Sequence, residues 1–279
     1  MKIALITNTF SDYLRQKIAV DSWIYLKSLY PDLQLINAQF SEDYNIPTPY
    51  PELETRYVLS NTQKKIPNAT KNLPLVKELF QCGIHTDAEY FIITNSDVII
   101  MPSLIQTIIE NKPVAWACSR LDIEPIDSFQ RILDKNVKPV RYEIAGFDVY
   151  SFQKEWAINN IQLFSDDFVL GKPLWDVAWA GYCKIFGENF PIGNGFPPHC
   201  FHIHHGIGSV MQSCPERDWN IGVAKNTPMT TLMINAMVFN LTQNLMRRTP
   251  AGSFLIPKDN ELVIEKVYFD CLNIHRNLL

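Results

Sequence analysis

One aspartate ends a strand-like segment in the N-terminal half of this sequence. The apolar run from Tyr90 to Thr94 leads into the polar triplet Asn95-Ser96-Asp97. In an open α/β sheet ligands collect at the carboxyl ends of the strands, so Asp97 is placed to meet one. A divalent cation that bridges a diphosphate would offset the cost of burying this carboxylate. The alternative is a turn aspartate that caps the helix after Pro102, and the residues leave both interpretations open.

Four of the six histidines lie in one short stretch of the C-terminal half, namely His199, His202, His204 and His205. Imidazole nitrogens are common ligands of divalent metals. If this stretch is extended, His202 and His204 share one face and His205 points the opposite way, so at most two neighbouring members could readily meet one metal. A zinc site with three histidine ligands is therefore not required. The alternative is a polar turn beside two prolines.

Two further carboxylates, Asp148 and Asp176, lie beside aromatic residues and glycines. Aromatic faces pack against the apolar side of a sugar ring, while a carboxylate accepts hydroxyl hydrogen bonds and can serve as a general base. Asp148 could instead be an ordinary residue at the edge of a strand. Asp176 could instead be the N-cap of the helix that continues through Trp179 to Phe186.

The elements that must position these residues alternate between strand and helix. Short apolar runs predict strands at residues 3–6, 33–36, 90–94, 98–100, 113–118 and 147–152. Helical periodicity predicts helices at residues 14–29, 72–83, 101–110 and 218–246. This alternation predicts an α/β fold. Because no Ser/Gly-rich or highly charged linker interrupts the chain, residues 1–279 are expected to form a single domain.

Composition narrows the class of protein. The 279 residues are 47% hydrophobic and 19% charged, which is enough material for an extended core. Lys and Arg number 25 against 29 Asp and Glu, so nucleic acid is only a minor possibility as a partner. No apolar stretch approaches the roughly 20 residues of a membrane span or resembles a signal peptide, which predicts a cytoplasmic protein. The oligomeric state is not indicated.

Taken in order, the segments resemble the GT-A nucleotide-sugar glycosyltransferases, in particular a group of soluble members. Arg15, followed by Ala19 to Trp23, resembles the R-x-x-x-A-x-x-S-W pattern of the first β-α unit. The segment Asn72-Leu73-Pro74-Leu75 is similar to a G-T-P-L helix start. Thr94-Asn95-Ser96-Asp97 resembles the N-[AS]-D variant of the D-x-D motif, whose last carboxylate holds the metal.

Three later segments carry the same resemblance. Residues 145–150 are similar to a G-x-D-x-F segment that contains Asp148, and residues 171–176 are similar to G-[RK]-x-x-W-D-N, with Val177 in place of the asparagine. Residues 202–205 resemble the H-x-x-H that such chains carry late. The resemblance covers residues 3 to about 205.

The resemblance implies a Rossmann-like, mixed but mostly parallel central sheet flanked by helices, with a helical C-terminal region. It implies a nucleotide-sugar-binding half at 1–115, an acceptor and catalytic half at 116–210, and a helical extension at 211–279. Mn²⁺ or Mg²⁺ would bridge the protein and the donor's diphosphate. The donor, a nucleoside-diphosphate sugar, and its metal would be held by these residues: Thr7, Asn8, Arg15, Asn95, Ser96 and Asp97, with His202 and His205 as further metal ligands.

Under this reading Asp176 is the first choice for the catalytic carboxylate and Asp148 the second. The acceptor could be a glycan, a small molecule, a protein or a hydroxylated nucleobase of phage-type DNA. Asn95 is a weaker metal ligand than a carboxylate, so a catalytically inert sugar-nucleotide-binding protein is an alternative. A metal-dependent nucleotidyltransferase is another, although the glycine-rich phosphate loop usual in that class is absent.

Overall fold

A computed structural model describes the chain except for residues 10–13, 41, 43–47, 188–197, 206–213 and 228–279. The strands are β1 (Ile3–Thr7), β2 (Leu33–Phe40), β3 (Glu54–Leu59), β4 (Tyr90–Thr94), β5 (Val98–Ile100), β6 (Ala115–Ile123), β7 (Pro139–Gln153) and β8 (Cys200–Ile203). The helices are α1 (Leu14–Leu29), α2 (Val76–Ile84), α3 (Pro102–Asn111), α4 (Gln130–Leu133), α5 (Lys154–Asn159), α6 (Trp175–Phe186) and α8 (Pro215–Asn226).

The described strands form one eight-stranded sheet in the order β3-β2-β1-β4-β7-β6-β8-β5. Strands β3, β2, β1 and β4 run parallel, and β7 is antiparallel between β4 and β6. Strand β8 is parallel to β6, and β5 is antiparallel to β8 at the edge. This mixed, mostly parallel sheet confirms the predicted fold class. It also brings the carboxyl ends of β4, β6 and β8 to one side of the molecule.

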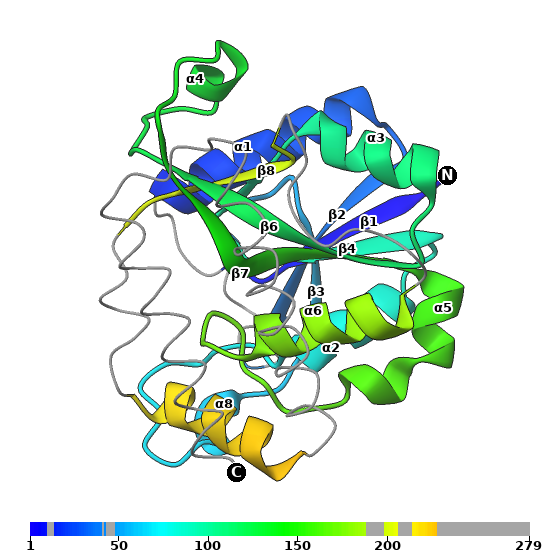
Figure 1. The fold of residues 1–279 in the computed structure, drawn as a ribbon, viewed down its shortest axis with the longest axis vertical. Coiled ribbons are helices and arrows are strands. Elements are labelled where there is room, and N and C mark those ends of the chain that lie inside the picture. The colour runs from blue at the N-terminus through cyan, green and yellow to red at the C-terminus, as the bar shows by residue number, and fades with distance from the viewer. Residues whose placement is uncertain (10–13, 41, 43–47, 188–197, 206–213, 228–279) are drawn as a thin grey trace, which may run out of the picture.

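Helices cover both faces of the sheet (Figure 1). Helices α1 and α3 lie on one face, and α2, α5 and α6 lie on the other. Adjacent residues of a strand point to opposite faces, so Leu5 packs with Trp23 of α1 while Ile6 joins the cluster of Phe80 in α2. The continuous apolar runs of β1 and β4 follow from this double burial.

Helix α1 fixes the edge strand that follows Asp97. The indole Nε1 of Trp23 donates a hydrogen bond to the carbonyl of Val98 at 3.1 Å. The backbone N–H of Ile100 donates to the hydroxyl of Ser22 at 3.1 Å. The Ser-Trp pair of the first motif therefore has a structural role, because it holds β5 and with it the position of Asp97.

The helices predicted at 72–83 and 218–246 differ from the observed helices at their boundaries. Helix α2 begins at Val76 and not at Asn72, because the Asn72 carboxamide accepts hydrogen bonds from Thr62 and the Pro74 carbonyl accepts one from Leu170. Those contacts keep residues 72–75 outside the helix. The helix expected at 218–246 begins at Pro215 and ends at Asn226, because the backbone of Thr227 is extended; residues 228–246 lie outside the described residues.

Candidate functional site

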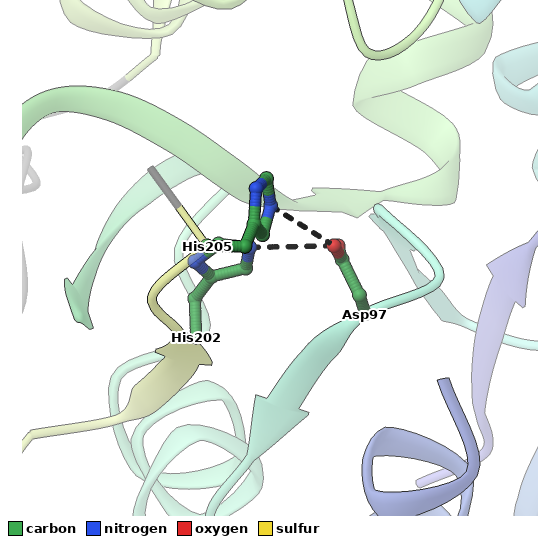
Figure 2. Close-up of side chains that lie close together, drawn as sticks. All are labelled: Asp97, His202 and His205. Atoms are coloured by element: carbon green, nitrogen blue, oxygen red, sulfur yellow. Dashed lines mark hydrogen bonds and ion pairs between the residues drawn. The ribbon is translucent and has the colours of Figure 1, made fainter. Parts of the chain in front are cut away.

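Asp97, His202 and His205 converge at the edge of the sheet (Figure 2). Strand β5 begins just after Asp97, and Val98 pairs with His202 of β8. Asp97 Oδ2 lies 3.3 Å from His202 Nε2 and 3.9 Å from His205 Nε2. One potential ligand atom from each residue lies within 4.8 Å of the others. This set of one carboxylate and two imidazoles has the composition and spacing of a divalent-cation site.

The histidine run is extended only in part. Strand β8 ends at Ile203, so the alternation that would send His205 away from His202 does not continue. The two rings lie with centroids 4.9 Å apart. His202 and His204 do share a face, as expected, and both contact Asp122. The fourth histidine, His199, lies elsewhere and contacts the hydroxyl of Ser103 at 3.0 Å.

Asp122 on β6 hydrogen-bonds to His202 and His204 and orients the ring of His202. Its side chain is fully buried and lies beside His202 in the register of β6 and β8. Its carboxylate accepts from His202 Nδ1 at 3.1 Å, from His204 Nδ1 at 3.4 Å and from Arg120 Nε at 3.0 Å. A carboxylate on Nδ1 places the imidazole hydrogen there and directs Nε2 outward. The Nε2 atom of His202 therefore faces Asp97.

The charges at this cluster favour an ionised Asp97. Burial opposes its ionisation, but the hydrogen bond from His202 and the positive charges of His202 and Arg120 hold the pKa of Asp97 well below its usual value. Burial also acts against a charged His202, yet its bonds to Asp122 and Asp97 raise the pKa of this imidazole. Burial, followed by the charge of His202, lowers the pKa of His205.

Asp148 on β7 is held by two neighbours and is not an edge residue. Asn95 Nδ2 donates to Asp148 Oδ1 at 2.5 Å, and a guanidinium N–H of Arg120 donates to Asp148 Oδ2. The backbone N–H of Asn95 also donates to the carbonyl of Asp148 at 3.3 Å. Both carboxylate oxygens are therefore occupied, and Asp148 ties the Asn95-Ser96-Asp97 triplet to Arg120.

Asp176 differs from Asp148 in having an unused oxygen. It is the second residue of α6, whose N-cap is Leu174, so the interpretation of Asp176 as an N-cap is wrong. Its Oδ1 atom is buried and has no hydrogen-bond partner among the described residues. Burial, and then the negative charge of Asp148, raise the pKa of Asp176 to about 7. A carboxyl group with such a pKa and a free oxygen is suited to accept a proton near neutral pH.

The capping interpretation of Asp97 is also wrong, because the N-cap of α3 is Met101. The remaining predicted donor-binding residues lie around the same strand ends. The Thr7 hydroxyl donates to the carbonyl of Thr94 at 3.1 Å, and Asn8 Nδ2 donates to the carbonyl of Ala38 at 2.7 Å. These two side chains are buried and tie neighbouring strands together.

Arg15 is the second residue of α1 and is partly exposed. Its positive charge contributes to lowering the pKa of His205, after burial and the charge of His202. Ser96 is partly exposed between Asn95 and Asp97. Whether these residues contact a donor stays a prediction.

The sequence prediction missed Arg120 and Asp122. The strand predicted at 113–118 continues to Ile123, so both residues lie on β6 beyond its expected end. Their alternation was the available signal, since residues two apart in a strand share a face.

The comparisons with known proteins rest on structure. No family model matches the chain, and no curated protein matches its sequence. Residues 1–349 of S. aureus TarS, in complex with UDP-GlcNAc, match over 94% of this chain and 78% of that one, with 12% identity and a TM-score of 0.50. The mannosyltransferase PcManGT from Pyrobaculum calidifontis, in complex with GDP-Man and Mn²⁺, matches over 99% and 84%, with 13% identity and a TM-score of 0.44.

The likeness to TarS confirms the α/β, GT-A-like fold expected from the sequence. Across the part of the chain that the structure describes, every helix is too short or too polar to cross a membrane.

Proposed function

We propose that this protein is a metal-dependent glycosyltransferase that moves a sugar from a nucleoside-diphosphate sugar to a hydroxyl acceptor. The observation that carries the proposal is the convergence of Asp97, His202 and His205 at the carboxyl edge of a GT-A-like sheet. The shared fold with a TarS fragment that holds UDP-GlcNAc supports a donor of this class. Residues 1–115 would supply Asp97, and residues 116–210 the histidines and catalytic carboxylates.

The three proposed ligand residues fit Mn²⁺ or Mg²⁺. Asp97 offers an ionised oxygen, while His202 and His205 offer Nε2 atoms on the same side. Imidazole ligands suit Mn²⁺ better than Mg²⁺, which prefers oxygen ligands and retains its waters. A bound ion would act as a Lewis acid that neutralises the diphosphate leaving group. Among the described residues three protein ligands converge here, which leaves coordination positions for phosphate oxygens.

Asp176 is the proposed general base. Its unpartnered Oδ1 would accept the proton of the acceptor hydroxyl while that oxygen forms a bond to the anomeric carbon and the bond to the diphosphate breaks. Asp148 is the weaker candidate because Asn95 and Arg120 occupy its oxygens. We assign to it the role of holding the polar triplet in place.

The proposal is tested with a panel of donors. The protein is mixed with Mn²⁺ and UDP-GlcNAc, UDP-glucose or GDP-mannose, and thermal shift is measured before release of the nucleoside diphosphate. We expect at least one donor to raise the melting temperature only with Mn²⁺ and then to be hydrolysed slowly, with water as acceptor. Mn²⁺-dependent binding without release would indicate the inert protein.

A second assay separates the nucleotidyltransferase alternative. UTP or GTP is incubated with a sugar 1-phosphate and Mn²⁺, and pyrophosphate is measured. A glycosyltransferase should release none above background. Pyrophosphate release together with inertness toward every nucleotide sugar would overturn the proposed reaction.

A further inference from the structure

One buried amide of helix α8 bonds to the backbone of the segment that leads into Asp176. Asn220 is fully buried. Its Oδ1 accepts from the N–H of Val169 at 2.9 Å, and its Nδ2 lies 3.1 Å from the carbonyl of the same residue. The same Nδ2 lies 3.4 Å from the carbonyl of Lys172 and 3.1 Å from that of Pro173. One side chain therefore satisfies the backbone of residues on both sides of Gly171.

The held segment has an unusual backbone. Gly171 has φ of 72°, a conformation that glycine adopts without cost. Leu174 has φ of 84°, which an L residue with a branched side chain rarely adopts. Such a conformation persists only where surrounding contacts determine it. Leu174 is the N-cap of α6, and Asp176 follows two residues later.

The opposite side of the segment is also paired. The N–H of Leu170 donates to the carbonyl of Pro74, and the N–H of Val76 donates to that of Phe168, both at 2.9 Å. These bonds involve residues up to 170. Between residue 171 and the start of α6, the Asn220 amide is the contact that reaches the carbonyls of Lys172 and Pro173.

We propose that Asn220 is a positioning residue for Asp176, holding the 169–174 segment in the conformation that keeps Asp176 Oδ1 buried at the start of α6. The inference rests on the proposed function of Asp176 as the general base. It gives α8, at the start of the C-terminal extension, a role in the catalytic half. Asn220 itself touches no reacting atom and acts through the segment.

Helix α8 also contains a matched control residue. Glu216 lies one turn before Asn220 on the same face and is 1% exposed. Its carboxylate accepts from the backbone N–H of Thr70 at 2.7 Å and of Lys71 at 3.0 Å. Truncating Glu216 therefore weakens the docking of α8 without removing a contact to residues 169–174. Both Glu216→Ala and Asn220→Ala remove a buried polar side chain of α8, and they differ in charge and in the segment that loses its hydrogen bonds.

The kinetic test uses Mn²⁺ and the donor of the panel that the parent hydrolyses fastest. We expect Asn220→Ala to lower kcat by up to about 100-fold with donor affinity unchanged, since a small misplacement of a catalytic group has effects of that order. Glu216→Ala should lower the melting temperature and leave kcat near the parent value. In a double-mutant cycle, Asn220→Ala should add little to Asp176→Asn. Equal kcat values for the two alanine variants, or additive losses in the cycle, would overturn the inference.

A second readout does not require turnover. The protein is labelled with carboxyl-¹³C aspartate, and the Asp176 signal is assigned by its loss in Asp176→Asn. Release of the segment exposes the carboxyl to water, so Asn220→Ala should move its pKa from about 7 toward the ordinary range, while Glu216→Ala should not. An unchanged Asp176 titration in Asn220→Ala contradicts the inference. If either alanine variant does not fold, Asn220→Ser and Glu216→Gln replace the pair.

The two readouts separate the two proposals. If Asp176→Asn retains full kcat, the proposed base is wrong, whatever the titration shows. If Asp176→Asn loses kcat while Asn220→Ala behaves as Glu216→Ala does, the base stands and only the positioning role of Asn220 fails.

Discussion

Two regions of the molecule are built in opposite ways. One is the cation cluster of Asp97, His202 and His205, and the other is the region around Asp176. Asp97, His202 and Asp122 lie on or beside three neighbouring strands, β5, β8 and β6, whose register places them next to one another. Asp176 lies in the first turn of α6, after a segment with two residues of positive φ. The cation cluster is joined by hydrogen bonds among charged groups, whereas Asp176 keeps a buried oxygen without a partner.

This difference indicates a division of labour. Paired groups in a rigid sheet suit the binding of an ion, because their geometry costs nothing to organise when the ligand arrives. A buried carboxyl with a raised pKa is poorly stabilised in its charged form and gains a partner when it accepts a proton. The comparison therefore predicts that changes at the sheet alter binding and stability, while changes at Asp176 alter turnover.

The largest expected effect belongs to Asp176→Asn. The amide cannot accept the acceptor's proton, so we expect kcat to fall by about 10² to 10⁴ with donor affinity unchanged. Initial rates of nucleoside-diphosphate release and calorimetric donor affinity, measured on the same preparation, check this. A variant that turns over donor at the parent rate would remove Asp176 from the mechanism.

Asp122→Asn should lower the affinity for the ion, although Asp122 is not one of its proposed ligands. Its amide cannot hold His202 Nδ1 and Arg120 as the carboxylate does, and losing such an orienting partner typically lowers metal affinity by about 10 to 100-fold. Mn²⁺ affinity is measured by calorimetry. The control is His204→Gln, which alters another partner of Asp122 but no proposed ligand. If both variants bind Mn²⁺ equally well, Asp122 does not orient the site.

The sequence predicts the sheet-borne part of the molecule better than the rest. Apolar runs such as Ile3 to Ile6 specify buried strands through local composition, and Asp97 could be recognised because it ends one of them. The sequence prediction missed Arg120 and Asp122 because strand β6 continues beyond the end of its apolar run. The entry to α6 could not be predicted, since the backbone before Leu174 bonds to Asn220, which lies 46 positions after Leu174 in the chain.

Asp148→Asn should lower the stability of the protein, which would distinguish the structural role of Asp148 from the catalytic role of Asp176. The amide leaves one guanidinium N–H of Arg120 without its charged acceptor, and hydrogen bonds to charged groups contribute about 2 kcal/mol. We expect a loss of that size in the free energy of unfolding, measured with urea at neutral pH. Stability equal to that of the parent would show that Asp148 does not anchor Arg120.

Asp176→Asn should act on stability in the opposite direction at high pH. The folded-state pKa of Asp176, about 7, is raised above its unfolded value, so its protonated form stabilises the fold and that contribution is lost as pH rises through 7. The variant should match the parent near about pH 4 and exceed it in stability above pH 7. Urea unfolding at both ends of this range measures the difference. A variant less stable than the parent at high pH contradicts the raised pKa.

The most direct test of the metal-dependent site is calorimetry on the parent and Asp97→Ala, titrating the donor of the panel that shifts the parent's melting temperature most. In the presence of Mn²⁺ we expect the parent to bind this donor and Asp97→Ala to lose that binding while keeping its fold, as judged by circular dichroism. Without Mn²⁺ both should bind weakly or not at all. Donor and Mn²⁺ affinities of Asp97→Ala equal to those of the parent would contradict the assignment of Asp97, His202 and His205 as the site of the ion.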